Sequence, residues 1–209
     1  MYENRNRYRW CFDRWKKYVI DYGTKFFLEN NIHYKVRDNK FDGKEIFDVT
    51  EDEYNLFLNN YIFEYSKNIQ IRPFASEIIK KLIKKHKIII ITARDYTTFE
   101  NKYQTKMQDI VKKWLCDNSV LYDEIVFSKN KALICKQKKI DIMIEDRPEN
   151  IVEIAKKIPV ICYNNVYNKN ISNKNVYRCF SWYDIYNIIN IWHKIFDYGI
   201  NNSIIYYYI

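Results

Sequence analysis

The chain has 209 residues, and its 35 Lys and Arg residues exceed its 26 Asp and Glu residues to give a formal net charge of +9. This length fits one α/β domain with a small elaboration better than two independent domains. No stretch reaches the roughly 20 apolar residues that a membrane helix needs, and the first residues are charged, so we expect a cytoplasmic protein with no membrane partner.

The positive charge is spread along the chain in short groups, such as Lys80-Lys81 and Lys84-Lys85 on an expected helix. Neither a basic tail nor the stacked aromatic pattern of an RNA-binding module accompanies it. A solvated helix face explains these lysines better than a nucleic-acid partner does. The cysteines are odd in number, widely spaced and without a C-x-x-C pair, which predicts reduced thiols and no zinc site: Cys11, Cys116, Cys135, Cys162 and Cys179.

The first third of the chain has a helical, aromatic pattern and no strong strand. Residues 38–43 have the composition of a loop, with a turn at Asp42-Gly43. Residues 50–53, Thr-Glu-Asp-Glu, have the capping-box form that opens a helix. We therefore expect residues 1–70 to form a small helical cap.

After Arg72-Pro73 the pattern changes to alternating helices and strands, which is typical of a doubly wound parallel sheet. Residues 71–209 are therefore expected to form an α/β core. The expected helices are 75–85, 105–117, 131–138, 148–157 and 182–196, the expected strands are 88–91, 124–127, 140–144, 159–163 and 176–180, and the Asn-rich segment 164–175 is expected to be a loop.

One apolar run of this core ends at Thr92, after four isoleucines. Ligands of open α/β sheets bind beyond the carboxyl ends of the strands. The Thr92 hydroxyl, together with the backbone amides of Ala93 and Arg94, can hold a phosphate there. Taken alone, Thr92 is better explained as a residue that merely ends a strand.

A second apolar run, Ile-Met-Ile, ends at Glu145-Asp146. Two adjacent carboxylates repel each other unless a cation or hydrogen bonds compensate them, and carboxylates are ligands that Mg²⁺ accepts. The alternative is that Asp146 caps the helix that begins near Pro148. Lys131 opens an expected helix, where its ammonium could neutralise a phosphoryl group, and Lys129 could serve instead.

These residues carry a resemblance to a known family. Ile-Thr-Ala-Arg at 91–94, Asn130-Lys131 and Ile-Glu-Asp-Arg-Pro-Glu-Asn at 144–150 resemble the second, third and fourth motifs of the haloacid dehalogenase-like superfamily. Their form is that of 5′(3′)-deoxyribonucleotidase-like (5′-nucleotidase type C) proteins. The resemblance spans most of the chain and implies a Rossmann-like α/β core with a helical cap.

The resemblance also implies an activity, namely Mg²⁺-dependent hydrolysis of a phosphomonoester, with a nucleoside monophosphate as the expected substrate class. Thr92 would then bind the phosphate. Lys131 would stabilise the charge on the phosphoryl group and on the nucleophile. Asp146 would bind Mg²⁺ directly, with Glu145 acting mainly around it.

The sequence departs from the family at the nucleophile. In the family this is the first Asp of an Asp-x-Asp motif after the first strand, and no two aspartates in this sequence are separated by one residue. Asp42-Gly43 is a poor replacement because no strand precedes it. We therefore expect a truncated, inactive chain whose first central strand is missing. Residues 204–209 could supply a pairing strand in the resulting gap, and the simpler alternative is that they pack on the surface or fray.

The competing class is a non-catalytic protein on a degenerate form of this fold. It would keep the anion pocket, or it would use the aromatic cap around Trp10, Phe12 and Trp15 as an interaction surface. Nucleic-acid binding is the third possibility.

Overall fold

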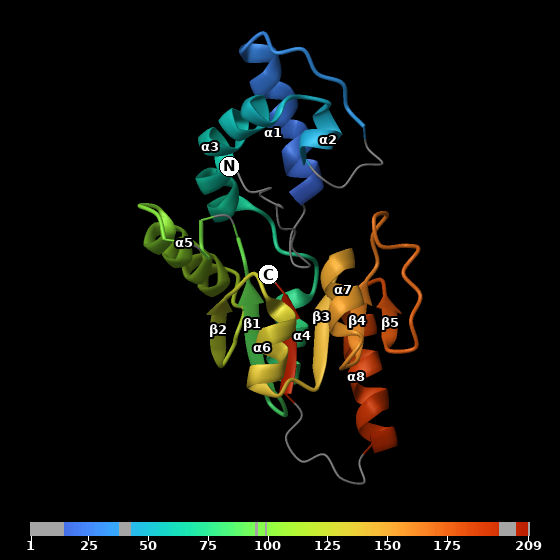
Figure 1. Ribbon diagram of the computed structural model, residues 1–209. Coiled ribbons are helices and arrows are strands. Elements are labelled where there is room, and N and C mark those ends of the chain that lie inside the picture. The colour runs from blue at the N-terminus through green and yellow to red at the C-terminus, as the bar shows by residue number, and fades with distance from the viewer. Residues whose placement is uncertain (1–14, 38–42, 95, 99, 197–203, 209) are drawn as a thin grey trace.

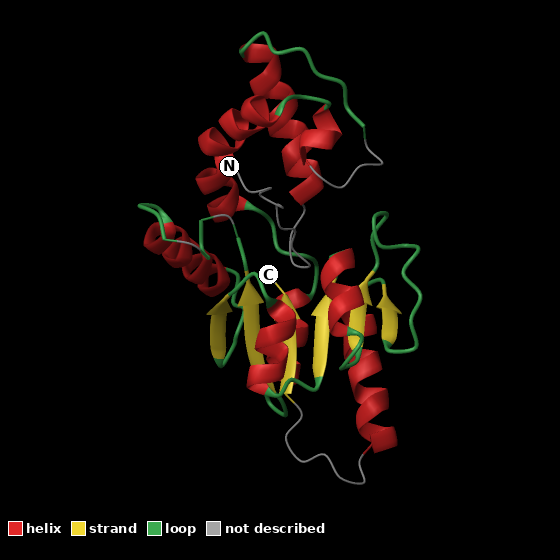
Figure 2. Cartoon of the chain, in the orientation of Figure 1, coloured by secondary structure: helices red, strands yellow, loops and turns green. Residues whose placement is uncertain are grey.

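The computed structural model describes residues 15–37, 43–94, 96–98, 100–196 and 204–208 (Figures 1 and 2). Its N-terminal part, which we call the helical region, consists of α1 (Trp15–Glu29), α2 (Gly43–Phe47) and α3 (Glu51–Asn68). The predicted capping box opens α3: the Thr50 hydroxyl accepts a hydrogen bond from the Glu53 amide, and the Glu53 carboxylate accepts one from the Thr50 amide.

The turn expected at Asp42-Gly43 is wrong for Gly43, which begins α2; Asp42 and the rest of 38–42 lie outside the described residues. Gly43 lies against the Tyr54 ring, where a Cβ atom would collide with the phenol. The need for close approach, rather than for a turn, accounts for glycine here.

Aromatic rings hold the helical region together. Phe27 of α1, Phe47 of α2 and Phe57 of α3 are buried and contact one another, with the Phe27 and Phe47 ring centroids 4.9 Å apart. Ring pairs of this kind add stabilisation beyond the area that they bury. Trp10 and Phe12 lie outside the described residues, as does the Trp15 side chain, so their role as an interaction surface stays a prediction.

The remaining elements, which we call the sheet region, alternate as the sequence predicts. The helices are α4 (Ala75–Leu82), α5 (Gln104–Asp117), α6 (Lys131–Lys138), α7 (Pro148–Ile154) and α8 (Trp182–Phe196), and the strands are β1 (Lys87–Thr92), β2 (Glu124–Phe127), β3 (Ile142–Glu145), β4 (Val160–Tyr163), β5 (Val176–Cys179) and β6 (Ile204–Tyr208).

Some boundaries differ from the prediction by two or three residues. The strand expected from Ile140 begins at Ile142, because the Ile140 amide donates to the Cys135 carbonyl and so closes α6. Lys139 makes that turn possible by adopting a left-handed conformation, with φ of 53°. Helix α4 ends at Leu82 rather than at residue 85, because the amides of residues 85 and 86 both donate to the Leu82 carbonyl in a turn.

The sheet has six strands in the order β2-β1-β6-β3-β4-β5, and every pairing is parallel. The strand at the centre of the family's sheet was expected to be missing. Instead β6 occupies the position between β1 and β3, with Tyr206 opposite both Ile89 and Met143. The prediction that residues 204–209 could supply a pairing strand is confirmed for residues 204–208.

Because all strands are parallel, their carboxyl ends meet at one edge, and the helical region lies over that edge (Figure 1). Helices α6 and α7 pack against each other, and so do α4 and α8. The interior residues of β1, β3 and β4 are buried and largely Ile and Val, as expected for strands covered on both faces. Within the described ranges, no helix is both long enough and apolar enough to cross a membrane.

Candidate functional site

Thr92 is the last residue of β1, at the edge that faces the helical region. Its side chain is fully buried, and its hydroxyl oxygen has no hydrogen-bond partner among the described residues. The backbone around it is fixed, since the Thr92 carbonyl accepts a bond of 2.8 Å from the Ser128 amide. A buried hydroxyl without a partner costs about 1–3 kcal/mol, so a ligand that accepts from it or donates to it would recover that energy.

The two residues after Thr92 are also buried, and the second of them connects β1 to the helical region. Ala93 has only a methyl group, and the Arg94 guanidinium turns toward the helical region, where it donates to the Ser66 carbonyl over 3.1 Å. It also lies 5.3 Å from the centre of the Tyr65 ring. The Arg94 side chain therefore fastens β1 to α3 through one nitrogen of its guanidinium.

A second contact ties the same loop to α3. The Tyr96 hydroxyl donates to the Asn59 side chain over 2.6 Å, and its ring stacks on Phe63 with centroids 6.0 Å apart. Tyr96 has a φ of 68°, a left-handed conformation that is unusual for an aromatic residue. The loop is held in this strained form by contacts with the helical region.

Lys131 and Glu145 form a buried ion pair at the end of β3. The Asn130 side chain accepts from the Leu133 amide and so begins α6, which places Lys131 in the first turn. The Lys131 ammonium donates to Glu145 Oε2 over 2.8 Å, and the two side chains are 1% and 0% exposed. An ammonium at a helix N-terminus opposes the helix dipole, and the carboxylate compensates for this.

Glu145 accepts three further hydrogen bonds. The amides of Asp146 and Arg147 donate to Oε1, each over 3.0 Å, and the Asn150 side chain donates to Oε2 over 2.9 Å. Burial raises the pKa of the Glu145 carboxyl above its ordinary value, and the neighbouring ammonium opposes that rise. With both oxygens engaged by protein donors, Glu145 has little capacity left for a cation.

Asp146 differs from its neighbour. Its Oδ2 accepts from the Tyr167 hydroxyl over 2.5 Å, but its buried Oδ1 has no hydrogen-bond partner among the described residues. The alternative that Asp146 caps the next helix is wrong, because the N-cap of α7 is Arg147. The Arg147 amide donates to Glu145 and not to Asp146. Asp146 therefore offers one unpaired carboxylate oxygen, the kind of ligand that a hard cation prefers.

The Asn-rich segment between β4 and β5 is a loop, as predicted, but it also builds the site. Asn168 is fully buried and donates to the Asp146 carbonyl over 2.7 Å and to the Tyr163 carbonyl over 2.9 Å. Tyr167 and Asn150 were not singled out from the sequence either. An aromatic residue inside a polar loop was the only signal for Tyr167, whereas Asn150 stands in the motif that follows β3.

The structure thus brings Lys131, Glu145 and Asp146 together at the end of β3, and places Thr92 on the other side of β6. Two strand spacings separate β1 from β3, which is roughly 10 Å. Among the described residues, no three His, Cys, Asp or Glu side chains gather around a common point. At the end of β3, Asp146 Oδ1 is a buried carboxylate oxygen that has no hydrogen-bond partner among these residues.

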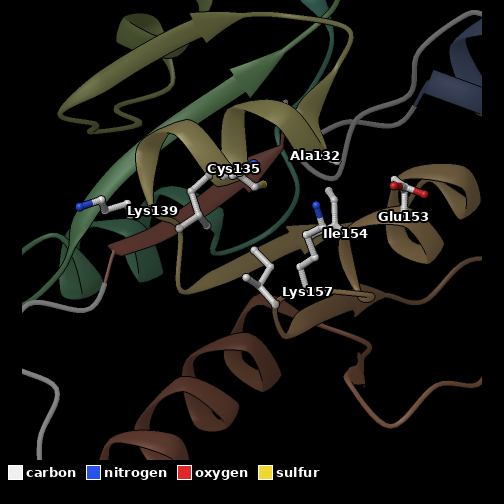
Figure 3. A pocket seen from close by; sticks show the side chains of 9 residues that line it. Ala132, Cys135, Lys139, Glu153, Ile154 and Lys157 are labelled. Carbon is white, nitrogen blue, oxygen red and sulfur yellow. The ribbon is translucent and has the colours of Figure 1, made fainter.

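A separate cavity of about 210 Å³ lies between α6 and α7 (Figure 3). Its walls include Cys135 and Ile154, and Lys139 and Lys157 line it as well. It is formed by the flanks of the two helices, and none of the candidate site residues lines it. The cavity is therefore distinct from the site at the strand ends.

A parallel α/β sheet with Thr at the end of one strand, a Lys at the next helix start and Glu-Asp after a later strand defines a haloacid dehalogenase-like protein. A sequence model of the 5′ nucleotidase, deoxy (Pyrimidine), cytosolic type C protein family matches residues 11–196. The chain belongs to this family.

Similar proteins of bacteria agree with that assignment. YqfW of Bacillus subtilis is 29% identical over 146 residues, which cover 68% of this chain and 71% of that protein. A nucleotidase of Clostridium acetobutylicum is 26% identical over 151 residues, 70% of this chain and 73% of its own length. The 5′(3′)-deoxyribonucleotidase of the same organism is 25% identical over 144 residues, 68% and 65% of the two chains.

Proposed function

We propose that this site binds a phosphomonoester of the nucleoside monophosphate class together with Mg²⁺, as in a nucleotidase. One observation carries the proposal: Thr92 Oγ1 and Asp146 Oδ1 are both buried at the same edge of the sheet, and neither has a hydrogen-bond partner within the described part of the chain. Membership of the family and the name of the deoxyribonucleotidase relative support the substrate class. We further propose that residues 1–70 act as the cap over this edge and that the protein is cytoplasmic.

Each residue then has a role. The Thr92 hydroxyl and the amides of Ala93 and Arg94 hold the phosphate oxygens. The Lys131 ammonium, which has three donors and gives one to Glu145, balances the phosphoryl charge. Asp146 would hold Mg²⁺, which supplies Lewis-acid neutralisation of the phosphate when bound. Glu145 orients Lys131 and does not itself bind the cation.

The nucleophile is the element that the sequence does not provide. The aspartyl nucleophile of the family stands in an Asp-x-Asp motif, and the sequence contains none. Without a carboxylate to attack phosphorus, a phosphoaspartate cannot form. We propose that the 209 residues bind phosphate and cation but do not turn the substrate over by themselves.

Binding is tested by calorimetric titration of inorganic phosphate and of a deoxynucleoside monophosphate, each with Mg²⁺ and with EDTA. We expect binding that depends on Mg²⁺ and that weakens at least tenfold in Asp146→Asn, which removes the charge but keeps the shape of the side chain. Asp117→Asn, at the end of α5, where the exposed carboxylate pairs with Lys113, is the matched control and leaves binding unchanged. Equal binding by Asp146→Asn and the unchanged chain would remove the metal role from this residue.

Hydrolysis is tested by supplying the missing motif. One variant adds an apolar strand ending in Asp-x-Asp before Met1, and a second places Asp-x-Asp directly after Tyr208, because β6 holds the central position in the sheet. We expect Mg²⁺-dependent release of p-nitrophenol from p-nitrophenyl phosphate in at least one of them. Folded variants that both lack turnover would count against the enzymatic proposal.

We also propose a second candidate function, because the residues proposed to bind phosphate and a cation are present without a nucleophile. In this alternative the chain is a non-catalytic anion-binding protein. Titration would then show phosphate binding, and neither Asp-x-Asp variant would show turnover. The two functions are thus separated by the hydrolysis assay and not by the binding assay.

A further inference from the structure

Asp146 is held by the loop that follows β4, and this loop is itself built around two asparagines and an arginine. Arg178 of β5 donates to Asn168 Oδ1 and to the carbonyls of Asn168 and Ile171, each over 3.0 Å. Asn168 in turn donates to the Asp146 carbonyl. The position of the Asp146 backbone therefore depends on a hydrogen-bonded network centred on the buried Asn168.

The same loop sets which oxygen of Asp146 is available. The Tyr167 hydroxyl accepts a hydrogen bond of 2.7 Å from the Asn165 side-chain amide and donates one of 2.5 Å to Asp146 Oδ2. Because Asn165 supplies a proton to the phenol oxygen, the phenol's own proton points at the carboxylate. One oxygen of Asp146 is thus occupied and the other, Oδ1, is left unpaired.

We propose that Tyr167 is a positioning residue that makes Asp146 offer a single oxygen to a cation and so selects Mg²⁺ over Ca²⁺. This inference rests on the proposed function of Asp146. Ca²⁺ tolerates six to eight oxygens and readily takes both oxygens of a carboxylate, whereas Mg²⁺ requires a compact octahedral set. A carboxylate with one oxygen already bound to a phenol disfavours the larger ion.

The test is a competition for Mn²⁺ followed by electron paramagnetic resonance of the free ion, with Mg²⁺ and Ca²⁺ as competitors. The unchanged chain is expected to prefer Mg²⁺. In Tyr167→Phe, which keeps the ring and frees Oδ2, we expect the ratio of Ca²⁺ to Mg²⁺ affinity to rise about tenfold. Asn165→Ala, which keeps the phenol but removes its donor, should shift the ratio in the same direction by less.

Two control variants separate positioning from general damage. Tyr177→Phe removes a phenol from β5, whose ring packs on Trp192, and leaves the ratio unchanged. Asn168→Ala breaks the buried network and lowers the affinity for both ions together, without changing their ratio. If the role of Tyr167 is purely structural, Tyr167→Phe will lower the affinity for both ions without changing their ratio, as Asn168→Ala does.

The outcomes distinguish this inference from the proposed function. A tenfold shift in Tyr167→Phe, with Mn²⁺ still bound, supports the positioning role. An unchanged ratio in both Tyr167→Phe and Asn165→Ala overturns it while leaving the Asp146 cation site in place. Failure of the unchanged chain to bind Mn²⁺ at all overturns both, and urea unfolding confirms that each variant is folded.

Discussion

The ends of β1 and β3 each carry a buried oxygen, Thr92 Oγ1 or Asp146 Oδ1, for which the described residues provide no hydrogen-bond partner. Each end also has a charged side chain bound to another element, but the two ends are connected to different parts of the molecule. At β1, Arg94 reaches out of the sheet region to the Ser66 carbonyl in α3. At β3, Glu145 binds Lys131 and Asn150, which belong to the adjacent helices α6 and α7. The β1 end can therefore respond to movement of the helical region, whereas the β3 end is fixed within the sheet region.

The largest expected effect comes from breaking the buried ion pair at the β3 end. Glu145→Gln removes the carboxylate that pairs with the buried Lys131 ammonium, and we expect the free energy of unfolding to fall by about 3–5 kcal/mol. Urea denaturation followed by circular dichroism measures it. In the double variant Lys131→Met/Glu145→Gln most of the loss should be recovered, and a loss as large as in the single variant would show that the ion pair is not its cause.

Strand β6 connects the two strands, because it pairs with both β1 and β3. Tyr206→Pro removes an amide from a strand that is paired on both sides, so we expect a loss of about 3 kcal/mol or more in the same urea experiment. Asn173→Pro, in the exposed loop before β5, is the comparison variant and should cost less. A Tyr206→Pro chain as stable as the unchanged one would mean that β6 does not occupy the centre of the sheet.

A smaller effect is expected when the link from β1 to the helical region is cut. Arg94→Met keeps much of the side-chain volume but leaves the Ser66 carbonyl without its donor, at a cost of about 1–3 kcal/mol. Hydrogen exchange should quicken in the last turn of α3 and stay unchanged in α6 and α7. Equal acceleration in both places would contradict the difference between the two strand ends.

The smallest effect on stability is expected at Thr92. Thr92→Val replaces a buried hydroxyl, which has no hydrogen-bond partner among the described residues, by a methyl group of similar size, so the free energy of unfolding should rise by about 1 kcal/mol. Phosphate binding, measured by calorimetry with Mg²⁺, should weaken by about tenfold or more. Serine at position 92 keeps the hydroxyl and should retain most of the binding; a loss as large as in the valine variant would point to packing instead.

Strand ends were predictable from the sequence because four isoleucines before Thr92 and an apolar run before Glu145-Asp146 give a strong local signal. Local sequence also placed Lys131 at a helix start. Local sequence could not show that Glu145 is fully hydrogen-bonded while Asp146 keeps one oxygen available, since this difference depends on which donors tertiary packing brings to each carboxylate. Tyr167 is 21 residues from Asp146 in sequence, and no periodic pattern connects them.

The pairing of the central strand β6 could not be predicted from the sequence, for a different reason. A β-prone run at 204–209 was visible, but its partner was not, because strand pairing between distant segments follows from topology and not from local preference. The aromatic residues of the helical region were likewise recognisable as helical, yet only the packed rings of Phe27, Phe47 and Phe57 show that they serve as a core.

The place of β6 also bears on the order in which the protein folds. Lys87 pairs with Ile204, so the ladder that unites β1 with β3 closes a very long loop, and contacts of such high sequence separation form slowly. A ribosome releases α1 to α8 before it releases residues 204–208. During synthesis the nascent chain therefore carries two incomplete half-sheets with exposed inner edges, which is the interval in which chaperones would have most to protect.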